Sequence, residues 1–358
     1  MHSRARAGTL AAALMMVSLM ACAGVAAAQD TPTRPRILVW SFHEENDVLA
    51  GTDRHYTQGF KFSLLREQEG SPGWMENLAP LLWNRFGDED LPFGFNGGWS
   101  IGQNMYNPAE IERVEPDPDD RPWAGWLYLG RTLQVSSDCE AGIGGAEPAD
   151  GEVVACRQQQ HTFELDLGVV GPLSGAKGAQ TELHKLIDSD PPLGWDNQLG
   201  NEPGLLLLYT GKWRYPNRSR TLDAIPHVRV GLGNVLTFAG AGGTVRLGRN
   251  LSGFGGDLIP AVQRGTRPRW EAYLFAGAEA RLVGVNIFLD GNHFRDSPSI
   301  DKEIFVYDLS GGGAVRYRSF RVAVTLVQRS PEFKPPSGRD LDPQKFGSFV
   351  LSWERGLP

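Results

Sequence analysis

The sequence predicts an all-β protein, an antiparallel transmembrane β-barrel of about twelve strands in a bacterial outer membrane. Three observations lead to this prediction. The chain begins with an export signal, and no later apolar run is long enough for a spanning helix. Many segments of about ten residues instead alternate polar and apolar side chains, as the strands of membrane barrels do.

The N-terminal segment, residues 1–28, is predicted to be a secretory signal peptide. Arg4 and Arg6 give it a positive start, the apolar stretch 10–25 follows, and the alanines at 26–28 offer a cleavage site. The apolar stretch is too short and too rich in alanine to span a membrane as a helix. The chain is therefore expected to leave the cytoplasm.

The mature chain, residues 29–358, is expected to form a single barrel domain, although its length alone would also permit two ordinary globular domains. Cleavage before Cys22, as in lipoproteins, is an alternative, but Met20 fits such a signal poorly. Both kinds of cleavage export the protein.

The predicted strands are longer than those of most soluble proteins. In the first of them, Trp40 and Phe42 fall on one side, and Ser41 and His43 fall on the other. The same alternation occurs in "HTFELDLGVVG", "RWEAYLFAGAEARLVG" and "SFRVAVTLVQRS". A soluble sandwich would hide the apolar side in a core and use strands of about five or six residues. A membrane barrel turns that side to lipid with strands of about ten residues, so the barrel is favoured.

Twelve such segments can be counted along the mature chain. They are expected to begin near Arg36, Tyr56, Gly97, Ala124, Gln160, Gly204, Leu222, Phe238, Trp270, Ile304, Phe320 and Phe346. An even number allows the first and last strands to pair antiparallel, so that no strand edge stays open.

One long connection has the pattern of a helix. Apolar residues recur at helical spacing between Ser174 and Asp190, and two prolines follow. Gln180, His184 and Asp188 are spaced four apart and would share a face, on which Asp188 could orient the imidazole or share a cation with it. A solvated helix face with an incidental histidine is the alternative, and the spacing leaves both open.

Four other histidines are weaker candidates for a catalytic base. His43 could fill the barrel, His55 lies in a turn, and His161 and His227 have the surroundings of strand residues. The sequence contains no G-x-S-x-G, no H-E-x-x-H and no glycine-rich phosphate loop. Attack by an activated water is therefore favoured over covalent serine chemistry.

The cysteines and the net charge bear on export and on partners. Cys139 and Cys156 flank a loop rich in glycine and alanine, so a disulfide is expected in an exported chain. A thiolate metal site is disfavoured because it needs more ligands at tighter spacing. The net charge of −7 argues against nucleic acid as a partner.

Oxygen-bearing side chains are dense in the stretch "ENDVLAGTDRHYTQGF". Asn46, Asp47, Asp53 and Thr57 surround one turn of this stretch. A surface loop could have such a composition for solubility alone. An oxygen-rich cation site would have the same composition.

This stretch resembles the N-terminal signature of the calcium-dependent outer-membrane lipid A 3′-O-deacylases. The resemblance continues in order through most of the mature chain. The further similar segments are "DRPWAGWLYLG", "ELDLGVVGP", "AQTELHKLI", "GWDNQLGNEP", "FAGAEARLVGVNIFLDGNHF" and "TLVQRSPEF". The resemblance implies a twelve-stranded outer-membrane barrel that hydrolyses the ester of the acyl (acyloxyacyl) chain at the 3′ position of lipid A. The expected cofactor is Ca²⁺, the expected substrate is lipopolysaccharide, and the chain is expected to act as a monomer.

The resemblance also implies site residues. The family's catalytic histidine, in a helix on an extracellular loop, corresponds to His184. Its Asn-Asp pair at the end of the first strand corresponds to Asn46 and Asp47, and the threonine of its "YT" element to Thr57. An acidic residue six positions after the histidine corresponds to Asp190, where some members have glutamate.

A basic pair that some members carry before the "DRP" element has no counterpart here. The matching loop, "NPAEIERVEPDPDD", is acidic. Arg113 or Arg121 is expected to take over recognition of the lipid headgroup.

These residues suggest a mechanism. Ca²⁺ held by Asp47, Asn46 and Asp190 would polarise the ester carbonyl, while His184 accepts a proton from the attacking water. The expected catalytic residues are His184, Asn46, Asp47, Thr57 and Asp188.

Two alternative functions remain. A non-enzymatic pore would keep the barrel but would not need a helix that carries His184. A phospholipase-type barrel would also hydrolyse acyl esters, but the serine and asparagine that it requires beside its histidine have no "NHxSNG"-like match here.

Overall fold

The computed structural model describes residues 36–46, 56–68, 93–137, 158–255 and 268–357. Several predicted features lie outside the described residues, namely the signal peptide, Asp47, Asp53, His55, Cys139 and Cys156. Within the described ranges, no helix is long and apolar enough to cross a membrane.

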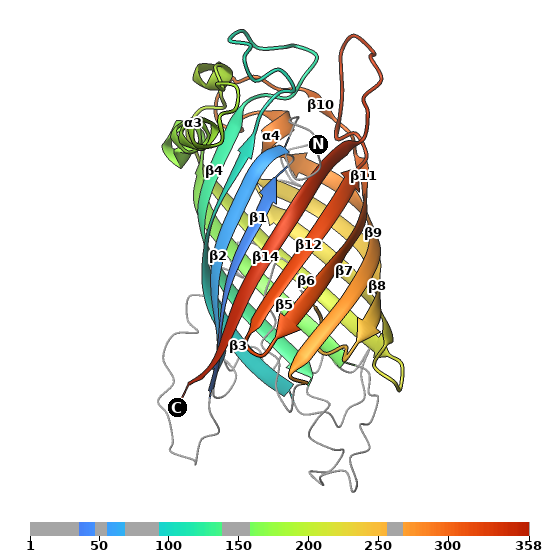
Figure 1. Cartoon of the computed structure of the whole chain (residues 1–358). Helices are drawn as coiled ribbons and strands as arrows, with labels where there is room; N and C mark the ends of the chain where they lie inside the picture. Colours follow the sequence, from blue (N-terminus) through green and yellow to red (C-terminus); the bar gives the residue numbers. More distant parts are fainter. Residues whose placement is uncertain (1–35, 47–55, 69–92, 138–157, 256–267, 358) are drawn as a thin grey trace, which may run out of the picture.

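Twelve antiparallel strands close into one barrel, in which the first strand pairs with the last (Figure 1). The barrel strands are β1 Arg36–Asn46, β2 Tyr56–Gln68, β3 Phe93–Tyr106, β4 Ala124–Ser137, β5 Gln158–Val170, β6 Glu202–Pro216, β7 Leu222–Gly233, β8 Leu236–Arg249, β9 Trp270–Asn286, β11 Phe305–Tyr317, β12 Phe320–Arg329 and β14 Gln344–Leu357. All twelve predicted strands are confirmed, and the largest difference is at β3, which was expected from Gly97 and begins at Phe93. A separate pair of two-residue strands, β10 Asp301–Lys302 and β13 Phe333–Lys334, was not predicted.

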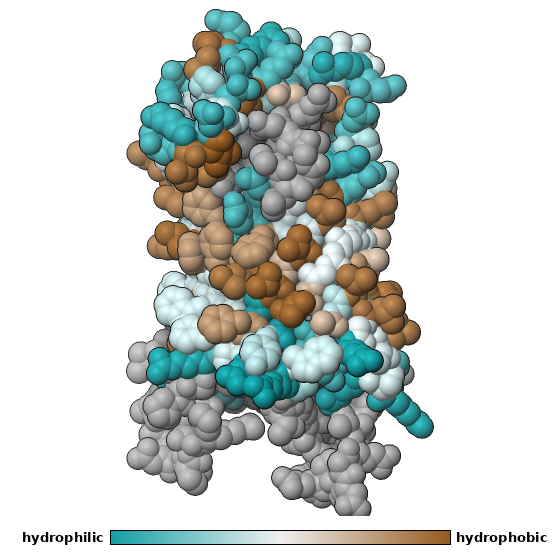
Figure 2. Space-filling model, in the orientation of Figure 1, coloured by the Kyte–Doolittle hydropathy of each residue, from teal (hydrophilic) through white to brown (hydrophobic). Residues whose placement is uncertain are grey.

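The alternation of side chains along the strands sorts them between the two faces of the wall. On β9, Leu274 is 70% exposed, whereas the neighbouring Glu271 and Tyr273 point inward and are buried. On β1, Trp40 faces outward and Ser41 is buried inside. Figure 2 shows the result on one face of the barrel, a hydrophobic band across the middle between two hydrophilic ends. The outward face is therefore suited to lipid, as predicted.

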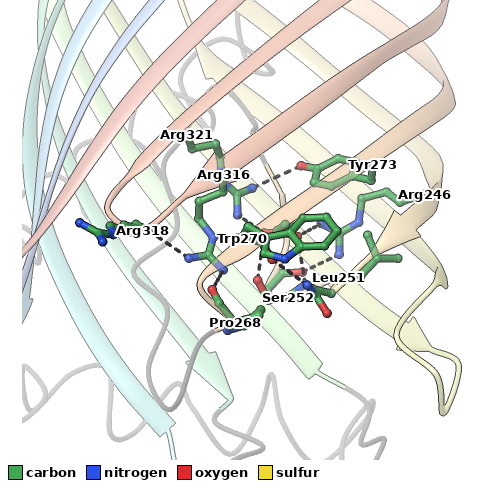
Figure 3. Close-up of polar contacts among 12 residues, drawn as sticks. Arg246, Leu251, Ser252, Pro268, Trp270, Tyr273, Arg316, Arg318 and Arg321 are labelled. Atoms are coloured by element: carbon green, nitrogen blue, oxygen red, sulfur yellow. Dashed lines mark hydrogen bonds and ion pairs between the residues drawn. The ribbon is translucent and has the colours of Figure 1, made fainter.

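Buried ion pairs line the lumen along β6 to β12 at the end of the barrel where Arg36 pairs with Leu357, which we call the terminal end (Figure 3). The charged layer consists of Asp223 and Glu271 with Arg214, Arg246, Arg316 and Arg321. Asp223 accepts hydrogen bonds from Arg246 at 2.6 and 2.8 Å and from Arg214 at 2.7 Å. Glu271 accepts from Arg321 at 2.9 Å and from Arg316 at 3.3 Å. Above this layer a cavity of about 260 Å³ remains in the lumen.

The helices gather at the opposite end of the barrel (Figure 1). The connection between β5 and β6 contains η3 Pro172–Ser174, α3 Ala176–Ile187 and η4 Gly194–Asn197, and α4 Ile287–Asp290 follows β9. The helix predicted between Ser174 and Asp190 is therefore confirmed but shorter. It begins after Gly175, whose φ of 72° permits the sharp entry, and ends at Asp188, which has a φ of 55°.

Candidate functional site

Helix α3 lies outside the barrel, against the outer face of its wall. On β3, Trp99 and Ile101 are exposed on the lipid side, so Gln103 and Met105 face the same way by alternation. Both are nevertheless buried, because the α3 connection covers them. Gln103 Nε2 donates to the carbonyl of Ser174 at 2.5 Å, and Met105 shares an apolar cluster with Ala176.

A glycine on β4 allows the helix to approach the wall this closely. Gly125 lies four residues before Leu129 on β4, so both face the same side of the wall. Leu129 is 60% exposed on the outer face. A Cβ at Gly125 would come within 2.2 Å of Ser174 Oγ and 2.4 Å of the Cβ of Ala176. A larger residue here would push α3 away from the barrel.

Two tryptophans fix the helix from its other side. Trp123, in the connection between β3 and β4, packs against Trp195 of η4 with ring centroids 4.9 Å apart. Trp195 is completely buried, and its Nε1 donates to Gln180 Oε1 at 2.6 Å. Gln180 Nε2 is also buried and makes no hydrogen bond in the described structure. Gln180 lies one helical turn before His184, so this contact positions the face that carries the histidine.

His184 is held in one orientation by the backbone. Its side chain is buried, and its Nδ1 lies 2.6 Å from the carbonyl oxygen of Asp190. A carbonyl can only accept a hydrogen bond, so Nδ1 carries the proton in this contact. In the neutral imidazole, Nε2 then keeps its lone pair and can accept a proton.

The position of Asp188 differs from the expectation. Because this residue leaves the helix at its C-terminal cap, it no longer continues the face of Gln180 and His184, and its side chain is exposed. Its backbone N–H, not its carboxylate, contacts His184 through the carbonyl of that residue. The Asp190 carbonyl takes the orienting role that was expected of Asp188.

The other expected site residues come from β1 and β2; β2 pairs with β3, and β1 pairs with β2. Asn46 is the last residue of β1, half-buried, on the same outward alternation as Trp40. The backbone of Thr57 lies in β2, one residue from Gln58, which pairs with Asn46. The side chain of Thr57 and all of Asp47 lie outside what the structure describes. Asn46 and His184 are thus carried by the outer side of the same wall, at the same end of the barrel.

Two of the residues expected to hold Ca²⁺, Asn46 and Asp190, lie in the described ranges. Asn46 supplies an amide oxygen, and Asp190 has an exposed carboxylate in the segment that orients His184. Such hard oxygens suit Ca²⁺ better than softer metals. Within the described ranges, no three His, Cys, Asp or Glu residues are grouped as metal ligands.

The two arginines considered for headgroup recognition have different surroundings. Arg121 is almost fully buried, with Nη1 3.4 Å from Glu332 and its guanidinium 4.7 Å from the ring of Tyr106. It joins two connections and does not face a substrate, so this expectation is wrong for Arg121. The side chain of Arg113 is 40% exposed and pairs with Asp117 at 3.0 Å. Of the two arginines, only Arg113 reaches the surface.

The remaining described histidines among the alternatives have partners away from α3. His43 Nε2 lies 2.8 Å from Ser348 Oγ, and His227 Nε2 lies 3.0 Å from Glu279. Both line the cavity in the lumen. His161 Nδ1 lies 2.9 Å from the hydroxyl of Tyr209. Trp195 and Trp123 are the site residues that sequence reasoning missed, although both lie in segments that carried the family resemblance.

Comparison with known proteins identifies a family and similar barrels. The profile of a family described as "Outer membrane protein LpxR" matches residues 10–144 and 153–355. Among solved structures, LpxR from Salmonella typhimurium is similar with a TM-score of 0.63 and 19% identity over 88% of this chain and 99% of that chain. The translocator domain of the autotransporter NalP from Neisseria meningitidis has a TM-score of 0.43 at 9% identity, covering 97% of each chain. The comparison with curated proteins gives no match.

Proposed function

Since the chain belongs to the LpxR family of outer-membrane proteins, we propose that it is a lipid A deacylase that removes the 3′-linked acyl (acyloxyacyl) chain of lipopolysaccharide by ester hydrolysis. The observation that carries the proposal is the setting of His184. It is buried against the lipid side of the barrel wall with Nδ1 committed to a carbonyl, which leaves Nε2 for a proton.

The location of α3 suits a substrate that is itself a membrane lipid. The helix covers the outer faces of β3 and β4, immediately beside exposed apolar residues such as Ile101 and Leu129. An ester near the surface of the outer leaflet can approach His184 from the side. It need not enter the lumen, whose terminal end holds the charged layer.

The roles of the chain's own residues follow from their chemistry. His184 Nε2 accepts a proton from the attacking water and returns it to the leaving alkoxide of the sugar. The Asp190 carbonyl keeps the imidazole in the productive tautomer. Asn46 and Thr57 would hydrogen-bond the substrate from the ends of β1 and β2, and their placement on the same wall supports this role.

Asp47, Asn46 and Asp190 would hold Ca²⁺. When bound, the ion would supply Lewis-acid polarisation of the ester carbonyl. The oxygen chemistry of Asn46 and Asp190, and their position at the α3 end of the barrel, support this assignment.

Assays of the purified, detergent-solubilised protein test the proposal. We expect release of fatty acid from lipid A and none from a glycerophospholipid, and loss of activity on chelation that Ca²⁺ restores. Preferential hydrolysis of the glycerophospholipid would indicate the phospholipase alternative. No hydrolysis of either lipid, together with steady conductance in planar bilayers, would indicate a pore.

A further inference from the structure

Large apolar side chains are exposed on the connection that carries α3. We call Leu173, Leu186, Ile187 and Leu193 the hairpin patch. Leu186 is 82% exposed and Leu173 is 69% exposed, more than most of the lipid-facing residues of the barrel itself. Figure 2 shows hydrophobic side chains among the hydrophilic ones in the region where Figure 1 places α3. Four large exposed apolar side chains on one short connection are unusual for a surface that faces water.

The hairpin patch adjoins the lipid-facing surface of the barrel. The α3 connection covers Gln103, and Ile101, two residues earlier on β3, is exposed to lipid. Two residues of a strand span about 7 Å, and a helix is about 10 Å across. The helix therefore rests directly on the upper rim of the hydrophobic band.

The two flanks of α3 differ in polarity. Leu186, Leu183 and Ala179 lie along one flank at helical spacing, whereas Lys177 and Thr181 lie along the other. Lys185, between them on the outer surface, is exposed and pairs with Glu182 at 2.8 Å. A helix with one apolar flank and exposed lysines is typical of elements that lie in the interface of a membrane.

We propose that the α3 connection, residues 171–201, is inserted into the outer leaflet of the protein's own membrane. The hairpin patch lies among the acyl chains, and Lys177 and Lys185 lie at headgroup level. The occupant of the patch is outer-leaflet lipid, because the patch continues the surface that lipid already covers. Insertion fixes the depth of His184 at the boundary between headgroups and acyl chains.

The position of the helix can be measured without any enzymatic assay. Single cysteines at Leu186, Lys185 and Leu129 would be labelled with an environment-sensitive fluorophore in the full-length protein, reconstituted in lipid vesicles. The unsubstituted protein, labelled in parallel, corrects for Cys139 and Cys156. Quenching by lipid-borne nitroxide is then compared with quenching by aqueous iodide.

We expect the label at Leu186→Cys to behave like the lipid-facing reference Leu129→Cys, with blue-shifted emission and strong quenching by nitroxide lipid. The label at the adjacent Lys185→Cys should be quenched by iodide. Equal access of iodide to both helix positions would overturn the insertion, and so would strong iodide quenching at Leu186 alone.

A second measurement links insertion to activity, and this measurement rests on the proposed function. The double variant Leu186→Ser with Ile187→Ser should lose activity on lipopolysaccharide in vesicles by roughly tenfold, because the transfer of two apolar side chains into lipid is lost. Activity on substrate dispersed in detergent micelles should stay near that of the unsubstituted protein. An equal loss in both media would show that the serines damage the site and would contradict a role in insertion. If the unsubstituted protein hydrolyses no lipid A, the proposed function fails, and the quenching result still decides the insertion.

Discussion

Trp195 Nε1 donates to Gln180 Oε1 at 2.6 Å, one helical turn before His184. The donor is on η4 and the acceptor on α3, so this bond joins η4 to the helix that carries His184. Since both side chains are completely buried, water cannot take the place of either hydrogen-bond partner.

Trp195→Phe should therefore lower turnover while leaving the fold intact. The ring still packs on Trp123, but Gln180 loses its donor, and a buried group without a partner costs about 1–3 kcal/mol. We expect kcat to fall more than KM rises, because α3 moves and the substrate surface does not. Trp99→Phe is the matched control, since Trp99 faces lipid and should tolerate the change. Unchanged kinetics in Trp195→Phe would contradict the positioning role.

His184→Ala should reduce kcat by about 10²–10⁴-fold, the usual contribution of a general base. Calcium affinity, measured by titration calorimetry on the detergent-solubilised protein, should stay nearly unchanged because His184 is not assigned as a ligand. His43→Ala and His55→Ala should keep most activity. An active His184→Ala together with an inactive His55→Ala would move the base to the stretch 45–60.

Asp47→Ala should abolish activity and calcium dependence together. Its carboxylate is proposed as a charged ligand of Ca²⁺, and an alanine offers no replacement. Calorimetry should show loss of calcium binding while the protein still migrates as a folded barrel. A variant that hydrolyses lipid A and still responds to chelation would refute the assignment.

Glu332, which pairs with Arg329 and Arg121, should make stability depend on acid pH. Burial raises the pKa of Glu332, but Arg329 and Arg121 lower it by more, so it lies below its ordinary value. The stabilisation is then complete above the ordinary carboxyl pKa and is lost as the pH falls through the lowered one. Glu332→Gln should flatten this acid dependence in thermal unfolding followed by gel mobility. The same acid sensitivity in Glu332→Gln would show that other carboxylates cause it.

Glu271→Gln should destabilise the barrel strongly. Glu271 is fully buried and receives Arg316 and Arg321, and removal of one partner of a buried ion pair costs about 3–5 kcal/mol. The unfolding temperature should fall, while kcat on micellar substrate stays the same because the charged layer lies at the end of the barrel away from α3. Glu182→Gln, which removes an exposed pair with Lys185, is the control and should have little effect.

The barrel was predictable because each strand carries its own alternating pattern of polar and apolar residues. Each strand shows its alternation within its own residues, as in β12, where Val322 and Val324 are exposed and Arg321 and Ala323 are buried. The strands β10 and β13 have two residues each and are too short to show any period.

The site was less predictable because its contacts depend on chain reversals. Spacing placed Gln180 and His184 on one face correctly, and it placed Asp188 there too. The left-handed backbone at Asp188 turns the chain so that the carbonyl of Asp190 meets the imidazole instead. Arg121 was expected to recognise the lipid headgroup, but it is buried against Glu332, which lies 211 residues away in sequence. No local pattern reveals such a pairing.

The position of α3 on the outer wall has a consequence for the kinetics of the enzyme. A substrate that arrives from the side travels within the leaflet, so the encounter is a two-dimensional search. Its frequency depends on the surface density and lateral diffusion of lipopolysaccharide, not on any concentration in the surrounding medium. Cations that cross-link neighbouring lipopolysaccharide molecules would then slow this search, even where they also fill the proposed calcium site. Turnover in an intact membrane should therefore follow the fluidity of the outer leaflet.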